Sequence, residues 1–146
     1  MKAYPHIYRV SALGSAAGTV PVSSAGLPDI TTAPPPEFDG PGGVWSPETL
    51  LVASIANCFI LTFRGVARAA HLDWEKLEAH VDGTLERVSG VTQFISYTTR
   101  ATLTVKPATD HAKARELLER AEKVCLVANS LRGERLLEAT VVESTG

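Results

Sequence analysis

Residues 46–71 read SPETLLVASIANCFILTFRGVARAAH, and this stretch decides the fold. Ser46 suits a helix cap, Pro47 suits the first helical position, and Glu48 complements the positive end of the helix dipole. Apolar residues then recur at helical spacing and also fill the remaining faces. A helix that is apolar nearly all round is a buried helix. The stretch therefore predicts a central helix that the rest of the chain, or a second copy of it, must cover.

The composition is that of a soluble globular protein. The chain has 146 residues, of which 45% are hydrophobic and 21% charged, and this predicts a single domain over residues 1–146. The net charge of −2 gives no electrostatic reason to expect a nucleic-acid partner. The apolar run reaches Arg64 before the ~20 residues that cross a bilayer, so we expect no membrane partner. The N-terminus lacks a signal-peptide pattern, which predicts a cytoplasmic protein with reduced cysteines.

Short strands are expected before the helix. Residues 4–13, 20–23 and 27–33 carry β-prone residues, and turns rich in glycine and serine separate them. Residues 34–43 read PPPEFDGPGG, and their prolines and glycines argue against any regular structure. We expect an ordered loop that leads into the helix, and loops of this kind often line sites.

Residues after the helix alternate between apolar and polar, which is typical of a half-buried β-hairpin. Its strands are expected from Leu77 to Glu86 and over 92–105, with a turn at Ser89-Gly90. Asp110 then caps an amphipathic helix over 111–125 that ends at Cys125. A short helix over 126–131 and a strand over 136–142 complete the chain. The order βββ-α-ββ-α(α)-β predicts an α+β fold with separate sheets.

The two cysteines are the candidate reactive groups. A free cysteine in an apolar helix is usually a packing residue, but Cys58 has a candidate partner in Cys125. One thiolate would attack an O–O bond and become a sulfenic acid, and the other would condense with it to a disulfide. Such a thiol needs a pKa below the usual ~8.5. Its own helix gives mid-helix Cys58 no help, so an arginine oriented by a carboxylate is the expected device.

Glu48 is a candidate for that carboxylate. It precedes Cys58 by ten residues, roughly 15 Å along a continuous helix, which is too far for direct contact within one chain. Glu48 is either a partner of the helix dipole or acts across a dimer interface or through an arginine. The four histidines show no ligand spacing and no phosphate-binding loop precedes a helix, so we expect neither a metal nor a cofactor.

The segments SPETLLVASIANCF and KVCLVANSL, with the loop FDGPGG before the first, resemble the superfamily of osmotically inducible protein C (OsmC) and organic hydroperoxide resistance protein (Ohr). The resemblance implies an intertwined homodimer whose long central helices are wrapped by antiparallel sheets, with active sites at the interface. It also implies a peroxidatic Cys58, a resolving Cys125 and a Glu48 that orients an arginine. The implied substrate is an organic hydroperoxide, and a dithiol, either a small molecule or a lipoyl-type protein, would be the reductant.

The chain departs from this family at three places. The family arginine lies in the first hairpin or just before the loop phenylalanine, where this chain has Ser15-Ala16-Ala17 and Glu37. Leu126 stands where the family usually has a proline. The remaining candidate cations are Arg9, Arg64 and Arg100.

Two functions are compatible with the sequence. The first is a cytoplasmic, dimeric thiol peroxidase of the oxidative-stress response, whose apolar pocket favours alkyl or lipid hydroperoxides. The second is an OsmC-like protein without fast peroxidase activity, which binds a small apolar ligand or senses oxidation slowly at the dimer interface. The retained cysteines favour the first, and the missing arginine favours the second. The candidate pocket residues, each with core packing as the alternative, are Phe38, Trp45, Phe59 and Phe63.

Overall fold

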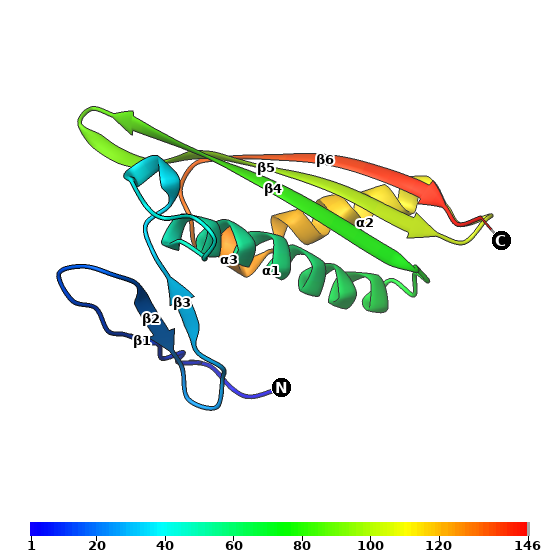
Figure 1. The fold of residues 1–146 in the computed structure, drawn as a ribbon. Coiled ribbons are helices and arrows are strands. Elements are labelled where there is room, and N and C mark those ends of the chain that lie inside the picture. Colours follow the sequence, from blue (N-terminus) through cyan, green and yellow to red (C-terminus); the bar gives the residue numbers. More distant parts are fainter. Residues whose placement is uncertain (146) are drawn as a thin grey trace. The chain divides into compact units, whose positions relative to one another are not determined.

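The computed structural model describes residues 1–145 and confirms the α+β class (Figure 1). Contacts within the chain define two compact units, Met1–Leu51 and Val52–Gly146. Helix α1, Pro47–Ala69, begins in the first unit and continues through the second. The single domain over 1–146 stays a prediction.

The first unit contains a small antiparallel sheet with the strand order β1-β2-β3. Its strands are β1 (Ser11–Ala12), β2 (Val20–Ser23) and β3 (Ile30–Thr32). The second strand lies where the sequence predicts it, but the first is far shorter than 4–13. Residues 4–10 are exposed and pair with no strand of the described chain. These residues favour an extended backbone, but no neighbouring strand is present for them to pair with, so they form no ladder of hydrogen bonds.

The proline-rich loop does contain regular structure, which corrects the sequence-based expectation for 34–43. Residues Pro36–Phe38 form one turn of 3₁₀ helix, η1, which ends at Asp39 in the left-handed region (φ 60°). The backbone N–H of Gly40 donates to the Pro35 carbonyl at 3.0 Å. Proline fixes φ near the helical value, so a single turn of this kind suits it at the start. The loop is therefore a defined turn that leads into α1.

Gly40 is expected to be the most demanding position of this loop. A Cβ added there would lie 1.6 Å from the Pro34 carbonyl oxygen, so Gly40→Ala must displace the backbone and is expected to cost about 3 kcal/mol of unfolding free energy. Gly43→Ala is the matched control, because its Cβ meets nothing within 4 Å and only its φ of +76° is unfavourable, at about 1 kcal/mol. Urea unfolding of both variants tests the order, and equal costs would contradict it.

The second unit is built on a three-stranded sheet with the order β4-β5-β6. Strands β4 (Lys76–Val88) and β5 (Val91–Val105) form the predicted antiparallel hairpin, with a register shift between Thr84 and Leu85. Strand β6 (Glu134–Glu143) pairs with β5 in parallel. A parallel neighbour requires a crossover connection. Helices α2 (His111–Lys123) and α3 (Leu126–Asn129) provide it.

The core of the second unit lies between this sheet and the helices α1 and α2, which cover the same face of the sheet (Figure 1). Asp110 caps α2 as predicted, since its Oδ1 accepts a hydrogen bond from the Lys113 N–H at 3.1 Å. The apolar face of α2 is buried, and its charged face is exposed. The largest fully buried side chains are Phe59, Phe63, Leu103, Leu118, Val105 and Cys125.

The N-terminus of α1 is capped by a reciprocal pair of hydrogen bonds. The Ser46 Oγ accepts from the Thr49 N–H at 3.1 Å, and the Thr49 Oγ1 accepts from the Ser46 N–H at 2.9 Å. This is the geometry of a capping box, with threonine in the place of the usual glutamate or glutamine. The predicted helix start is confirmed, and the helix ends at Ala69 rather than His71.

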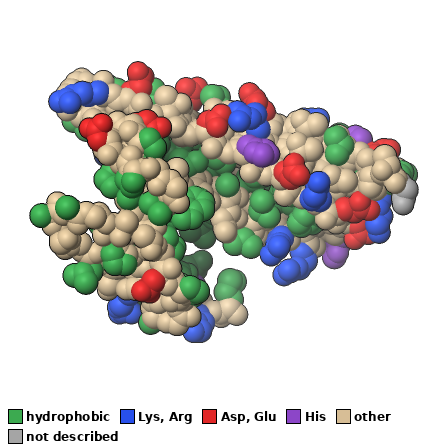
Figure 2. Space-filling view, in the orientation of Figure 1, with side chains coloured by type: hydrophobic (Ala, Val, Ile, Leu, Met, Phe, Trp, Pro, Cys, Tyr) green, Lys and Arg blue, Asp and Glu red, His purple; other side chains and the backbone are tan. Residues whose placement is uncertain are grey.

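The apolar surface of α1 is largely uncovered within one chain. The helix has 23 residues, and its most apolar 18-residue window has a mean hydropathy of 1.8 with only 22% of that window buried. Figure 2 shows apolar side chains gathered over this part of the surface, and Leu61 is 53% exposed. By length and composition the helix could cross a bilayer, so the expectation of no membrane partner stays a prediction. Core helices of soluble proteins pass the same test, and α1 is therefore not assigned to a membrane.

Candidate functional site

The fold of the second unit brings Cys58 and Cys125 together. Cys58 lies in the middle of α1, as predicted. Helix α2 ends at Lys123 and not at Cys125, because Cys125 has an extended backbone (φ −63°, ψ 109°) and is the N-cap residue of α3. Cys125 is thus at the start of a helix rather than at the end of one. Both cysteines are free thiols.

Four neighbouring groups lower the pKa of Cys58. Burial raises the pKa of this thiol, but the backbone N–H of Val127, the Cys125 thiol, the Thr62 hydroxyl and the backbone N–H of Leu126 lower it. The Thr62 Oγ1 lies 3.7 Å from the Cys58 Sγ. The donors together outweigh burial, so the pKa of Cys58 lies below its ordinary value. Cys58 is therefore the thiol of the pair that ionises first.

Cys125 is shifted in the opposite direction. Burial raises its pKa most, the backbone N–H groups of Ala128 and Val127 lower it, and the neighbouring Cys58 raises it as a hydrogen-bond acceptor and as a negative charge. The net pKa of Cys125 is raised, and its side chain is 1% exposed. Cys125 is thus the thiol of the pair that loses its proton at the higher pH. Such a division between two coupled groups is typical of a nucleophile and its partner.

The donors at Cys58 correct one step of the sequence argument. The first backbone N–H groups of a helix have no partner within that helix. In α3 these groups belong to Leu126 and Val127, and they serve the Cys58 sulfur on another helix. Cys58 therefore does receive help from a helix terminus, although not from its own. The contact of Thr62 with Cys58 can be predicted from their spacing of four residues on one helix. The contact of α3 with Cys58 cannot be predicted in this way.

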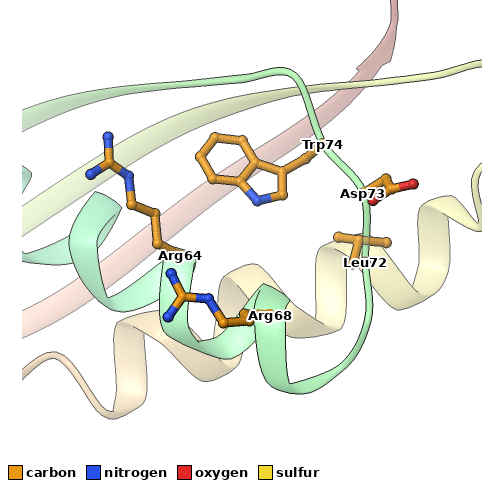
Figure 3. A pocket seen from close by; sticks show the side chains of 5 residues that line it. All are labelled: Arg64, Arg68, Leu72, Asp73 and Trp74. Carbon is orange, nitrogen blue, oxygen red and sulfur yellow. The ribbon is translucent and has the colours of Figure 1, made fainter. Parts of the chain in front are cut away.

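No arginine is among the groups that shift the Cys58 pKa in the described chain. Arg64 and Arg68 line a pocket of about 340 Å³ with Leu72, Asp73 and Trp74 near the C-terminal end of α1 (Figure 3). Arg100 is paired with Asp82, at 2.6 Å between Nη1 and Oδ2. Arg9 is an exposed residue of the first unit. Within the second unit, the groups that lower the Cys58 pKa are thus backbone and side-chain donors, where the sequence analysis expects an arginine.

Glu48 has an unusual environment for a carboxylate. Its Oε2 is buried, yet it has no hydrogen-bond partner among the residues that the structure describes. A buried carboxylate oxygen without a donor is costly. The part that Glu48 plays at a site stays a prediction.

The four aromatic pocket candidates separate into two pairs. Phe59 and Phe63 are 1% and 0% exposed and belong to the core cluster, which is the packing alternative given for them. Phe38 and Trp45 are 52% and 51% exposed in the first unit. Trp45 lines a shallow pocket of about 320 Å³ there. A ligand role for Phe38 and Trp45 stays a prediction.

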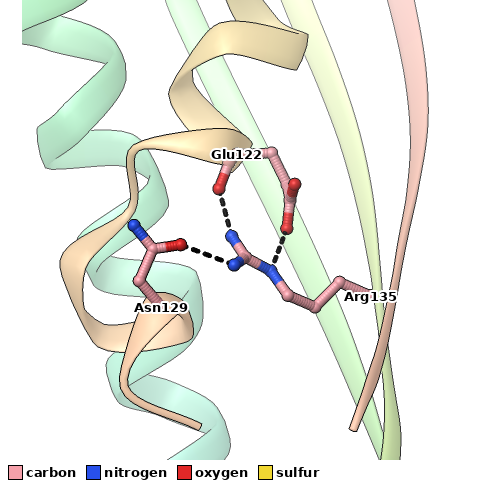
Figure 4. Close-up of polar contacts among 3 residues, drawn as sticks. All are labelled: Glu122, Asn129 and Arg135. Carbon is pink, nitrogen blue, oxygen red and sulfur yellow. Dashed lines mark hydrogen bonds and ion pairs between the residues drawn. The ribbon is translucent and has the colours of Figure 1, made fainter. Parts of the chain in front are cut away.

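A polar cluster that the sequence did not indicate links Arg135 to Glu122 and Asn129 (Figure 4). Arg135 of β6 donates from Nε to the Glu122 Oε1 at 2.6 Å and from Nη1 to the Asn129 Oδ1 at 2.6 Å. Its Nη2 donates to the backbone carbonyl of Glu122. Glu122 lies on α2 and Asn129 on α3, so the cluster joins the two helices on either side of Cys125. Among residues 1–145, no group of three His, Cys, Asp or Glu is placed to hold a metal ion.

The two thiols are expected to differ in their reaction with iodoacetamide as pH rises. Only the thiolate reacts, so the lowered pKa gives Cys58 its half-maximal rate at a lower pH than an ordinary thiol, and the raised pKa puts that of Cys125 at a higher pH. Mass mapping of the modified peptides at each pH measures the two profiles separately. Thr62→Val is expected to move the Cys58 profile upward in pH, because it removes one donor. Coincident profiles for the two cysteines in the wild type would contradict the assignment.

Two comparisons of the sequence find similar proteins. The model of the family described as OsmC-like protein matches residues 40–138. The uncharacterized protein YmaD of Bacillus subtilis (strain 168) is 30% identical over 112 residues, which cover 73% of this chain and 75% of YmaD.

Solved structures show the same fold. An organic hydroperoxide resistance protein OsmC from Legionella pneumophila has 25% identity and a TM-score of 0.75, over 95% of this chain and 98% of that one. An OsmC-like protein of unknown function from Vibrio cholerae has 16% identity and a TM-score of 0.84, over 92% of this chain and 99% of that one. The second likeness concerns the fold alone.

Proposed function

Because the chain belongs to the OsmC-like protein family, we propose that it is a thiol-dependent peroxidase that reduces organic hydroperoxides through Cys58 and Cys125. The observation that carries this proposal is the apposed pair of free thiols whose pKa values are shifted in opposite directions. The organic hydroperoxide resistance protein from Legionella pneumophila, at 25% identity, supports the class of substrate.

The proposed reaction begins at Cys58. Its thiolate attacks the terminal oxygen of the hydroperoxide, an S–O bond forms, the O–O bond breaks, and the alkoxide takes a proton and leaves as the alcohol. Cys58 is then a sulfenic acid, oxidised by the two electrons that reduced the peroxide. The Cys125 sulfur attacks it, an S–S bond forms, the S–O bond breaks, and hydroxide leaves as water with the Cys125 proton. A dithiol, small or lipoyl-type, restores both thiols by exchange and is itself oxidised to a disulfide.

The active form is proposed to be the intertwined homodimer. Two observations support a second copy: the apolar surface of α1 that is left uncovered in one chain, and the buried Glu48 oxygen without a donor. An arginine from the partner chain would satisfy Glu48 and complete the anionic site. Light scattering is expected to give twice the chain mass of 15.5 kDa, and a monomer at micromolar concentration would contradict the dimer.

The test of the proposed function is the rate of oxidation at neutral pH. Wild-type protein is mixed with cumene hydroperoxide or with hydrogen peroxide, and the product is mapped by mass spectrometry. We expect a fast reaction that prefers the organic peroxide and ends in a Cys58–Cys125 disulfide. A rate equal to that of free cysteine would overturn the proposal.

One observation favours a second candidate function. No arginine contributes to the Cys58 thiolate within the described chain, and an arginine is the family's device for fast peroxide chemistry. In this alternative the protein binds a small apolar ligand or senses oxidation slowly at the same interface. The slow rate named above, together with slow accumulation of the disulfide, is the result expected of a sensor.

A further inference from the structure

We propose that Arg135 is a positioning residue, which holds the backbone of residues 125–127 against the Cys58 thiol. The inference rests on the proposed function only where it treats Cys58 as the reacting group. The contact itself is a property of the second unit, and it is measurable without any peroxide.

The geometry of the Arg135 cluster sets the course of the chain around Cys125. Its guanidinium binds the side chain and the backbone carbonyl of Glu122 on one side, and the side chain of Asn129 on the other. Glu122 lies three residues before Cys125 and Asn129 four residues after it. A guanidinium is planar and rigid, so its donors fix the directions of the groups that they bind. One side chain thus ties both ends of the segment that carries the donors to Cys58.

The segment needs such support because it has little structure of its own. Helix α3 has only four residues, and a helix of this length is not stable in isolation. Its Ser130 hydroxyl donates to the Leu126 carbonyl at 2.8 Å, which is a contact within the segment and does not attach it to the rest of the protein. Arg135, by contrast, is paired with Tyr97 in the ladder between β6 and β5. The cluster therefore fastens a short helix to the sheet.

The burial of the cluster makes its contacts effective. The side chains of Arg135 and Glu122 are only 23% and 20% exposed, and the Nε–Oε1 distance is 2.6 Å. A partly buried ion pair of this kind is screened by salt much less than an exposed pair. Removing one partner also leaves the other charge partly buried without its counter-charge. The position of residues 125–127 should therefore depend on Arg135.

The consequence concerns the state of Cys58. Hydrogen bonds weaken steeply as distance and angle depart from the ideal, and the N–H groups of Leu126 and Val127 and the Cys125 thiol all lie on the fastened segment. Thr62 is the one remaining donor at the Cys58 sulfur, and it lies on α1. Loss of Arg135 is expected to weaken three of the four donors at once and to raise the pKa of Cys58.

The experiment is the pH profile of iodoacetamide alkylation at Cys58, mass-mapped in the wild type, Arg135→Met, Arg135→Lys and Arg115→Met. We expect Arg135→Met to raise the Cys58 pKa by about one unit, which lowers the rate at neutral pH up to tenfold. Arg135→Lys keeps the positive charge but lacks the planar guanidinium with its several donors, so its Cys58 pKa should lie between those of the wild type and Arg135→Met. Arg115→Met is the matched control, because Arg115 of α2 also donates to a backbone carbonyl across the α2–β6 contact, that of Ala139, which lies roughly 13 Å from Arg135 along β6. It should leave the Cys58 profile unchanged.

An unchanged Cys58 profile in folded Arg135→Met, or an equal shift in Arg115→Met, would overturn the proposal. Circular dichroism shows whether Arg135→Met is folded at the assay temperature. If it is not, Asn129→Ala decides, since it removes only the contact at the end of α3, and an unchanged profile there counts against Arg135. If the wild type alkylates as described but reduces no hydroperoxide, the proposed function is overturned. The role of Arg135 at Cys58 still holds in that case.

Discussion

Cys58→Ser is expected to reduce hydroperoxide consumption to the level of buffer alone, whereas Cys125→Ser is expected to consume one equivalent per chain, as the wild type also does when no reductant is present. Serine keeps the size of cysteine but is not ionised at neutral pH, so Cys58→Ser has no nucleophile for the O–O bond. Cys125→Ser retains the Cys58 thiolate and can form a sulfenic acid, but nothing condenses with it. The measurement is peroxide loss without added reductant, with dimedone present to trap the sulfenic acid.

The two variants separate the roles because the products differ. The wild type should end as a disulfide without a dimedone adduct, and Cys125→Ser should carry one adduct on Cys58. An adduct on Cys125 in Cys58→Ser would reverse the assignment of nucleophile and partner. Such a reversal would conflict with the opposite pKa shifts of the two thiols.

Phe63→Ala is expected to lower the unfolding free energy by about 3–5 kcal/mol, the range for a fully buried aromatic residue. Phe63 is 0% exposed, and its ring meets that of Trp74 edge-on, with 5.3 Å between centroids. Truncation removes this contact and leaves a cavity between α1 and the sheet. Most single substitutions cost far less, so this variant should be close to the limit of stability.

Urea unfolding followed by tryptophan fluorescence measures this effect, because Trp74 lies against the altered position. The matched control is Arg64→Ala, the next residue of α1, whose side chain is exposed. The midpoint of this control should stay close to that of the wild type. A midpoint for Phe63→Ala that matches the control would show that the ring is not a core residue.

Most of the fold could be predicted because its signals are local. The cap at Ser46, the cap at Asp110 and the alternating pattern of the hairpin each depend on residues close in sequence, and the structure confirms all three. The first strand was predicted too long because β propensity acts only where another strand is present to pair with. The prolines of η1 predict an irregular loop, but their fixed φ also suits one helical turn, which the structure contains.

The site could be predicted only in part. Residue type, spacing and resemblance predict Cys58, Cys125 and Glu48, and the structure brings the two thiols together, while the part of Glu48 stays a prediction. The donors at Cys58 could not be found in this way, because they are main-chain groups and every residue has them. Their position depends on where α2 ends and on an arginine ten residues beyond Cys125. A tertiary contact of this kind leaves no local pattern in the sequence.

The register shift in the hairpin has a consequence for local motion. It lies between Thr84 and Leu85. Ser96 of β5 is paired with Thr84, and β6 pairs with β5 only from Ser96 onward, so β6 does not reach beyond the shift. Beyond this point β4 and β5 continue as a two-stranded ribbon, whose tip residues Val88 and Val91 are 44% and 57% exposed. Ribbons without a third strand are marginal in water. Amide hydrogens near the tip should therefore exchange with solvent through openings that leave the three-stranded part of the sheet closed.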